Sequence, residues 1–559
     1  MSVFIGYPSF MAYQMMKGKK GNNDGFPSVP GMIARYSALG LTNEQMAANP
    51  VWVDKTGNGH DLQMKNFAWK EGSGISDIYP GALVFDGVDD YGVCDNFPIL
   101  TKEKGYTVVA LRQWITRGKG ALGLVSNVKN WLKDGAFLLE YRNIQADHLN
   151  KPISFGAIGS EIDLPHILTY QTSKSCNGVS ITTGNFEGTD VLHVGKLAPT
   201  NVGTCINAAI WELVFLDHDA TEEELTKIKD YFVKTYPWLF PDQAWTVVGK
   251  TNEDEDRATI ANITGNGNDL VLSNFGFAEG SGYGLYYQYF GNEFKATNGE
   301  IEGGGWNIID NYNISHDKRI PINSIGKCFW GNKALVNGIK LRFKLTGMTE
   351  GDVLAFGYAT IYDLTYTSDG IYAIDLPPVD KSYGFSLQSS LTENLPTTPV
   401  TIELLPFEYE GYLVTDGVDD KVQSSSFTMN EDWTIVGDWE LLSNVQINCG
   451  IVKAQNVYPY NIANGLLISI NNPRSLQSFG TKSLHAICSD GRLYDRNWVE
   501  YKYTADQNFS IVESSLNIGF NLNNYTQMAF KNLGIYNNQL LSKDDCIKAY
   551  NYLQTLKAK

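Results

Sequence analysis

The sequence predicts an all-β protein made of two copies of one β-sandwich unit, with a further β-sandwich inserted into the second copy. Two sequence strings that each occur twice indicate the duplication, and short stretches of alternating apolar and polar residues indicate strands. The composition agrees, because 31 Tyr, 54 Gly and an aromatic content of 12% favour antiparallel sheet with many turns. With 559 residues, the chain is long enough for about three or four domains of roughly 150 residues each.

The two repeated strings have different offsets. Residues 56–75, TGNGHDLQMKNFAWKEGSGI, match residues 264–283, TGNGNDLVLSNFGFAEGSGY, at an offset of 208. Residues 83–93, LVFDGVDDYGV, match residues 413–423, LVTDGVDDKVQ, at an offset of 330. About 122 additional residues therefore separate the strings in the second copy, and we place them at 285–408. Each first string begins with a turn signal, because Asn-Gly tolerates positive φ at both central positions of a tight turn.

Both copies are expected to end with a strand, a turn and one short helix. In the first copy, Thr221 and Glu224 form a capping-box pattern, in which each side chain accepts the free backbone N–H of the other residue. In the second copy, Ser542 stands at the cap and Asp545 at the third helical position. These endings lie 321 residues apart, in agreement with a large insertion plus small loop changes.

These boundaries divide the chain into four predicted parts. Residues 1–50 form an N-terminal arm, residues 51–240 the first copy, residues 246–284 plus 409–559 the second copy, and residues 285–408 the inserted domain. The arm lacks periodicity and carries Gly and Pro signals, which predict an extended or loop-like segment. Its early apolar residues need burial, either by packing on the first copy or by docking on another chain.

The inserted domain has alternating stretches of its own. Period-two alternation broken by Gly, Pro and Asn predicts antiparallel strands with one buried face, and a β-sandwich is the natural architecture for them. The stretches cover residues 338–347, 370–376, 383–390 and 399–407.

The charge balance excludes several classes of partner. Lys and Arg total 44 against 61 Asp and Glu, a net charge of −17, and such a surface repels nucleic-acid phosphates and anionic membranes. The sequence has no apolar run of the about 18 residues that a membrane span needs, which predicts no membrane insertion. The N-terminal segment lacks the order of a signal peptide. The seven Cys are odd in number and lack Cys-x-x-Cys spacing, which predicts reduced thiols, no zinc site and no cofactor.

The opening of the first copy and its acidic turn together resemble laminin-G-like domains. Trp52, Asp54 and the following Thr-Gly-Asn-Gly-His-Asp-Leu fit the pattern Trp-x-Asp-x-(Thr/Ser)-Gly-Asn-Gly-x-Asp-Leu, and residues 85–91 give Phe-Asp-Gly-Val-Asp-Asp-Tyr. The resemblance implies tandem concanavalin A-like (laminin-G-like) jelly-roll sandwiches. The second copy departs from the pattern, since Asn262 stands in the region of the Asp and Thr415 replaces the Phe.

A narrower resemblance covers the second copy and the insert. Residues 251–284, together with a β-rich insert that ends in LPFEYEGYLVTDGVDD, resemble virion structural proteins of crAss-like phages that infect Bacteroides. The resemblance implies a head fibre or another capsid or tail appendage, assembled in the host cytoplasm and located in the virion. We expect a homo-oligomer, dimer or trimer, whose N-terminal arm docks on a capsid or appendage protein and whose outward loops contact host glycans.

The repeated aspartates allow two interpretations. Asp86, Asp89 and Asp90 are hard oxygen ligands within one turn, and calcium prefers such ligands. The sequence has no EF-hand order of ligands, however, and carboxylates in a turn commonly accept hydrogen bonds from nearby backbone N–H groups. The pattern therefore favours a structural turn and keeps a metal site as the alternative.

Exposed aromatic faces beside Asn, Asp and Gln are typical of sugar-binding sites. The candidates in the insert are Trp306, Trp330, Tyr358, Tyr362 and Tyr366. The three Tyr are four residues apart, so an uninterrupted strand would place them on one face. A buried stripe in a core or an interface is the alternative.

Catalytic patterns are weak. Glucanases of the concanavalin A-like fold place two Glu on one strand, and the nearest string is EIDLPHI, residues 161–167, which keeps Glu161 and Asp163. Pro165 and His166 stand where the second Glu belongs. The sequence therefore predicts a non-enzymatic structural protein. A bacterial surface or secreted glycan-binding lectin is the second hypothesis, and a glucanase-like polysaccharide hydrolase is the third.

Overall fold

The structure is a computed structural model of the whole chain. Strands dominate it, which confirms the predicted all-β class. Helices among the described residues are α2 (Asn43–Ala48), α3 (Glu222–Thr235), α4 (Lys543–Gln554) and the 3-10 helix η3 (Pro237–Leu239), and none of them is long and apolar enough to cross a membrane. The residues that the structure describes are 24–100, 104–116, 121–127, 138–142, 168–176, 179–180, 189–196, 205–278, 280–286, 306–309, 313–322, 328–329, 339–358, 361–376, 384–391, 393–405, 407–442, 457–462, 465–470, 477–479, 484–502, 512–518, 520–521, 524–525 and 527–558.

Two sheets with α2 and α3 form the first unit, residues 24–235. The larger sheet has the order β12 (Val179–Ser180), β11 (Ser175–Cys176), β10 (Leu168–Thr172), β7 (Thr107–Trp114), β14 (Asn207–Leu216), β5 (Leu83–Asp86) and β4 (Gly74–Ile75), with β1 (Met32–Ser37) also on β14. The smaller sheet has the order β2 (Val51–Trp52), β3 (Leu62–Lys65), β6 (Tyr91–Asp95), β13 (Val191–Val194), β8 (Ala121–Ser126) and β9 (Leu138–Arg142).

The larger sheet of the first unit is buried on both faces. Successive residues of a strand point to opposite faces, and in β7 both sets are buried, with an apolar run at residues 108–111. Val108 and Ala110 belong to the core between the two sheets. Val109 and Leu111 belong to a second core, which also contains buried residues of α3. The continuous apolar run of this strand therefore follows from its position between two cores.

The arm predicted for residues 1–50 extends too far along the chain. β1 pairs antiparallel with β14 and belongs to the larger sheet, and Thr42 caps α2 through a capping box. Residues 24–50 are thus part of the first unit, although no repeated string in the sequence marks β1. Residues 1–23, which hold the early apolar side chains, lie outside the described residues, and both the packing and the docking of this segment stay predictions.

The second unit, residues 243–286 and 407–558, repeats the two-sheet arrangement. Its larger sheet has the order β18 (Gly282–Tyr286), β29 (Phe407–Val414), β41 (Met528–Asn537), β31 (Trp433–Leu441), β35 (Leu484–Cys488), β36 (Arg492–Asp495) and β37 (Glu500–Lys502), with β15 (Gln243–Thr246) on β41. Its smaller sheet has the order β16 (Thr259–Ile260), β17 (Leu270–Ser273), β30 (Lys421–Met429) and β38 (Val512–Ile518). Short sheets add β32 (Val457–Ile462), β33 (Gly465–Ile470), β34 (Gln477–Phe479), β39 (Phe520–Asn521) and β40 (Asn524–Tyr525).

Equivalent strands of the two units pair in the same way. β15 pairs antiparallel with β41, as β1 does with β14. β31 pairs with β41 as β7 does with β14, and both pairings contain a register shift, between Asp438 and Trp439 in the second unit and between Ile210 and Glu212 in the first. The second copy therefore begins at β15, three residues before the predicted start at residue 246.

The insert, residues 306–405, is a third pair of sheets. One sheet has the order β19 (Asn307–Ile308), β20 (Asn313–His316), β28 (Val400–Leu405), β23 (Ile339–Thr346) and β26 (Gly370–Leu376). The other has the order β21 (Ile320–Pro321), β27 (Gly384–Ser389), β24 (Asp352–Tyr358) and β25 (Ile361–Tyr366), with β22 (Cys328–Phe329) on β27. Phe343, Phe356 and Phe385 lie at the centre of the core between these sheets. The four predicted alternating stretches coincide with β23, β26, β27 and β28.

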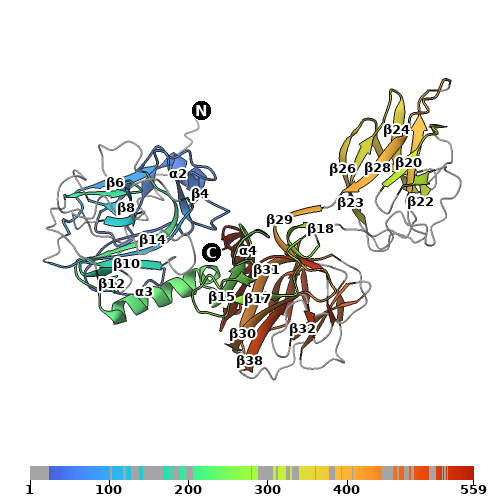
Figure 1. The fold of residues 1–559 in the computed structure, drawn as a ribbon. Helices are drawn as coiled ribbons and strands as arrows, with labels where there is room; N and C mark the ends of the chain where they lie inside the picture. Colours follow the sequence, from blue (N-terminus) through green and yellow to red (C-terminus); the bar gives the residue numbers. More distant parts are fainter. Residues whose placement is uncertain are drawn as a thin grey trace, which may run out of the picture.

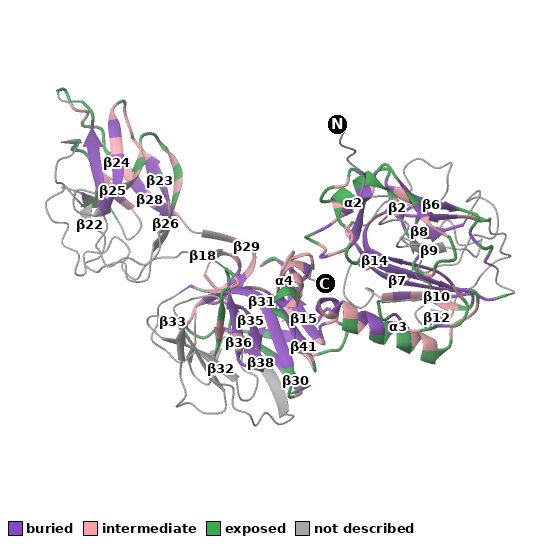
Figure 2. Ribbon diagram, turned by 180° about the vertical axis from the view of Figure 1, so that it is seen from behind, coloured by how far each residue is buried: buried purple, intermediate pink, exposed green. Residues whose placement is uncertain are grey.

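One apolar core joins the first unit to the second. It contains residues of α3, η3 and α4 together with residues of both larger sheets. The rings of Trp211 in β14 and Tyr552 in α4 meet edge to face at 6.2 Å, and Tyr536 of β41 donates a 2.9 Å hydrogen bond to the carbonyl of Trp238. Figure 1 shows α4 and the C-terminus between the two units, and Figure 2 shows the central strands β7, β14, β31 and β41 buried.

Because of this common core, the two units are expected to unfold together. Replacing Trp211 with Ala removes a fully buried side chain at the junction and should cost about 3 to 5 kcal/mol. Differential scanning calorimetry should show one transition for both units, and the whole transition should move to lower temperature in the variant.

Phe343→Ala is the matched control, because this side chain is fully buried in the insert's own core. It should lower only a separate transition that belongs to the insert. Two separate transitions for the two units, with Trp211→Ala moving only one of them, would contradict the common core.

Candidate functional site

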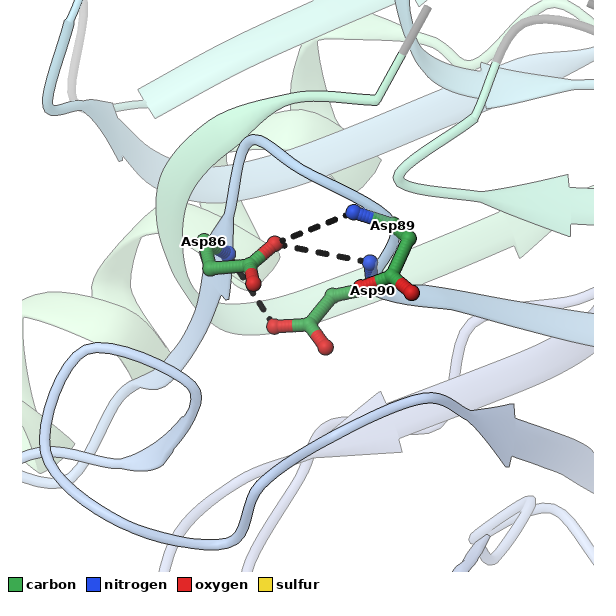
Figure 3. Close-up of side chains that lie close together, drawn as sticks. All are labelled: Asp86, Asp89 and Asp90. Atoms are coloured by element: carbon green, nitrogen blue, oxygen red, sulfur yellow. Dashed lines mark hydrogen bonds between the residues drawn. The ribbon is translucent and has the colours of Figure 1, made fainter. Parts of the chain in front are cut away.

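The acidic turn of the first unit connects β5 to β6. Asp86 ends β5, and its Oδ1 accepts the backbone N–H of Val88 at 2.7 Å. The same oxygen accepts the backbone N–H groups of Asp89 at 3.3 Å and Asp90 at 3.5 Å (Figure 3). Gly87 has φ +79°, and a Cβ there would lie 2.9 Å from the Cβ of Asn207. Only glycine satisfies both conditions without strain, which explains the Asp-Gly pair at this corner.

The last aspartate of the turn is buried and closes it from the other side. Asp90 Oδ2 accepts the backbone N–H of Asp86 at 3.1 Å, so the two residues bond each other's main chain (Figure 3). Asp90 has no exposed surface. Burial raises the pKa of its carboxyl to about 6, and the nearby charges of Asp86 and Asp89 act in the same direction.

The second unit reproduces this turn between β29 and β30. Asp416 Oδ1 accepts the N–H groups of Val418, Asp419 and Asp420 at 2.7, 3.2 and 3.4 Å. Asp420 Oδ2 accepts the N–H of Asp416 at 2.8 Å, and its Oδ1 accepts the hydroxyl of Ser281 at 2.9 Å. Burial raises the pKa of Asp420 to about 7. The repeated sequence therefore encodes one repeated hydrogen-bond pattern.

The first repeated string is hydrogen-bonded to the acidic turn that follows it. Asn66 donates its side-chain N–H to the carbonyl of Asp89 at 2.9 Å, and Asn274 donates to the carbonyl of Asp419 at 3.0 Å. In both units, the Asn therefore joins the strand after the Thr-Gly-Asn-Gly turn to the acidic turn. These bonds explain why the two strings recur together.

The same string also fixes the neighbouring edge of the unit. Asn58 donates its side-chain N–H to the carbonyl of Ile33 in β1 at 2.8 Å. Asn266, its counterpart, donates to the carbonyl of Asp242 beside β15 at 2.8 Å. The Asn of each Thr-Gly-Asn-Gly turn thus holds the first strand of its unit in place.

Each turn also brings three carboxylates together. The ligand oxygens of Asp86, Asp89 and Asp90 lie within 4.8 Å of one another, and the same holds for Asp416, Asp419 and Asp420. Such a cluster can hold a hard cation, but calcium takes six to eight oxygen ligands. In both turns the first aspartate already accepts three backbone N–H groups, which supports the structural interpretation. A metal site remains the weaker alternative.

The aromatic candidates of the insert do not form the open face expected from their spacing. Trp306 is buried in the core, with its ring 5.0 Å from that of His316. Tyr366 packs on Tyr372 and Phe343 at the edge of the same core. These positions agree with the alternative of a core stripe, which the sequence pattern does not distinguish from a surface stripe, and a role of either side chain in glycan binding stays a prediction.

The other three aromatic candidates have no described side chain. Tyr358 ends β24 and Tyr362 lies in β25, so the three Tyr belong to two paired strands and the premise of one uninterrupted strand fails. Trp330 lies outside the described residues, as does the glucanase-like string 161–167 with Glu161. A role of these residues in binding or catalysis stays a prediction.

Sequence reasoning missed a buried ion pair in the first unit. Arg35 of β1 donates two 3.1 Å bonds to Glu212 of β14, and both side chains are fully buried. Tyr231 accepts a third bond from Arg35, and Tyr236 donates to Glu212 at 2.7 Å. Asp24 completes the network with a 2.6 Å ion pair to Arg35. The partners lie up to 196 residues apart, so no local pattern indicates this network.

Comparisons with known proteins do not place the chain in a family. No protein-family model and no curated protein matches it. The Trypanosoma rangeli sialidase in complex with sialic acid is 13% identical, with a TM-score of 0.24 over 40% of this chain and 38% of the sialidase. The botulinum neurotoxin serotype D binding domain is 8% identical, with a TM-score of 0.25 over 72% of this chain and 88% of that domain. This chain covers less than two thirds of the sialidase, and neither similarity is close enough to bear on function.

The raised pKa values of Asp90 and Asp420 predict that stability falls as the pH rises. A carboxyl with a folded-state pKa of about 6 or 7 binds its proton more tightly than the unfolded chain, where the value is about 3.9. This contribution is present below pH 4 and is lost as the pH rises through 6 to 7. Asp420→Asn, which mimics the protonated form, should therefore gain about 1 to 3 kcal/mol relative to the natural chain between pH 5 and pH 8.

Urea denaturation of the natural chain and of Asp420→Asn, at pH 5 and at pH 8, measures the difference in their free energies of unfolding. Asp419→Asn is the matched control, because Asp419 is an exposed member of the same turn and should give no such gain. An equal response of the two variants would contradict the assignment of the buried carboxyl.

The backbone bonds of Asp86 and Asp416 predict little dependence on metal ions. Adding EDTA or millimolar calcium should move the melting temperature by no more than a few degrees, because backbone N–H groups already satisfy these carboxylates. Thermal melts with and without each reagent test this. A large rise with calcium that disappears in Asp89→Asn would restore the metal site.

Proposed function

We propose that this chain is a non-enzymatic structural protein of a virion, either a head fibre or another capsid or tail appendage of a tailed phage. The resemblance of residues 251–284, and of the insert's C-terminal end, to virion proteins of crAss-like phages supports the proposal. The proposal includes the finer fold, in which the two units are tandem laminin-G-like, concanavalin A-like jelly rolls. The equivalent pairing of β1 with β14 and of β15 with β41 supports that part.

The observation that carries the proposal is the common core of the two units. It combines α3, η3 and α4 with both larger sheets, so separating the units would expose many fully buried side chains. A particle appendage needs a fixed shape and resistance to proteases, and proteolysis of folded proteins depends on how often they open. Two units that cannot separate without losing a core suit that role.

The aspartate turns support a structural role as well. Asp86 and Asp416 direct their carboxylates at the backbone of their own turns. A catalytic carboxylate must instead reach a substrate proton or a reacting carbon. The repeated chemistry of this chain is thus better suited to shaping strands than to catalysis.

Partners belong to the proposal too. Residues 1–23 are the segment that would dock on a capsid or appendage protein, and the chain would assemble as a symmetric dimer or trimer in the virion. Outward loops would contact host glycans weakly, and several copies would act together.

Mass spectrometry of purified particles tests the virion role. Phage particles from lysates in which this chain is synthesised should contain it at a fixed copy number, as expected for a symmetric appendage. Its presence in the host envelope fraction, together with its absence from particles, would favour the glycan-binding surface protein instead.

Deletion of residues 1–23 tests the docking segment. The deletion keeps Asp24, which pairs with buried Arg35, so the melting temperature should stay within a few degrees of that of the full chain. Incorporation into particles should be lost. Incorporation at the full level would contradict docking through this segment.

A further inference from the structure

The insert is joined to the second unit through β18 and β29. Leu413 and Val414, at the end of β29, pair both with β18 and with β41 and so belong to the sheet of the second unit. Further along, residues 284–286 pair with residues 407–409 and, within the described part of the chain, with no third strand. The connection therefore narrows to a two-stranded ribbon, which is marginally stable by itself in water.

The register of this ribbon breaks where it leaves the sheet. Tyr283 lies opposite Leu413, but the next residue, Gly284, lies opposite Tyr409. Residues 410–412 therefore bulge out of β29. Gly284 has φ +105°, and Gly411, within the bulge, has φ +75°. A bulge with a glycine at positive φ on each strand bends the ribbon at this point.

Close packing does not hold either glycine. A Cβ on Gly284 would meet no heavy atom within 4 Å, and one on Gly411 would meet only Val248 Cγ2, at 3.7 Å. The conformation of the backbone, and not a lack of space, requires glycine at these positions.

The cores on the two sides of the ribbon are separate. Among the described residues, the core of the insert shares no member with the cores of the second unit. Figure 1 shows the insert away from the two units, beyond β18 and β29. Relative motion is the default for domains that lack a large apolar interface, and the ribbon supplies none.

The base of the ribbon is fixed at the last residue of the bulge. Tyr412 donates its hydroxyl to Asp438 Oδ2 at 2.9 Å, and Lys531 Nζ lies 5.4 Å from the centre of the Tyr412 ring. Tyr550 and Gln554 of α4 donate to the same oxygen at 3.2 and 3.1 Å. α4 also packs in the common core, so Asp438 ties Tyr412 to that core.

We propose that Gly284 and Gly411 form a hinge, about which the insert swings as one body relative to the fused units. Tyr412 holds the near side of the hinge, and the ribbon of residues 407–409 with 284–286 forms the moving side. The hinge follows from the ribbon's geometry alone and does not depend on the virion role. In a virion, it would let the insert reach several positions around a fixed base.

Single-particle images of the full chain test the hinge. After alignment on the two fused units, the insert should occupy a continuous range of positions. One fixed position of the insert in every particle would overturn the proposal, and it would leave the proposed virion role unaffected.

Hydrogen exchange measured by mass spectrometry tests the anchor. In the natural chain, amides of residues 407–409 should exchange faster than those of Leu413 and Val414. Tyr412→Phe removes a hydrogen bond to a carboxylate, so exchange in residues 407–412 should rise about tenfold. Tyr550→Phe, the matched control, removes a bond to the same oxygen from α4 and should leave these residues unchanged.

Two results would overturn the assignment. Exchange in residues 407–409 that is as slow as in Leu413 and Val414 would show that the ribbon does not open separately from the sheet. Equal effects of the two Tyr variants on residues 407–412 would show that Tyr412 is not the specific anchor.

Discussion

The burial of apolar side chains between the two larger sheets holds the molecule together. α3, η3 and α4 form a layer there, and Trp211 from one unit meets Tyr552 from the other. This layer covers the outer faces of β7 and β14, which are buried along almost their whole length, whereas β3 of the smaller sheet alternates between buried and exposed residues. A sandwich with one solvated outer face would not need such strands. The two copies therefore behave as halves of one body.

The position of the insertion follows from the same sheet. β18 lies at the end of the strand order, next to β29, so the chain can leave and return at an edge without interrupting a central pairing. The central strand pairings of the second unit are therefore kept, and the inserted domain has its own core. The result is two units joined by one core, with the separately folded insert at one edge of the second unit. In each unit, the Asn of the Thr-Gly-Asn-Gly turn fixes the backbone at or beside the first strand, β1 or β15.

Sequence patterns predicted the local features and missed the long-range ones. The repeated Asp-Gly-Val-Asp-Asp turns were predictable, because Asp86 bonds residues at most four positions away. The helix caps at Thr221 and Ser542 were predictable for the same reason. The Arg35–Glu212 pair and the common core depend on residues far apart in sequence. Trp306 shows a further limit, since the sequence around an aromatic residue does not distinguish a position in a core from one on a surface.

Native-state hydrogen exchange of β14 and β41 tests the common core most directly. If the two units are one cooperative body, the slowest amides of these strands should have the same free energy of opening, and Trp211→Ala should lower both by the same amount. Different opening free energies in the natural chain, with the substitution affecting β14 alone, would contradict the account and show two independent domains.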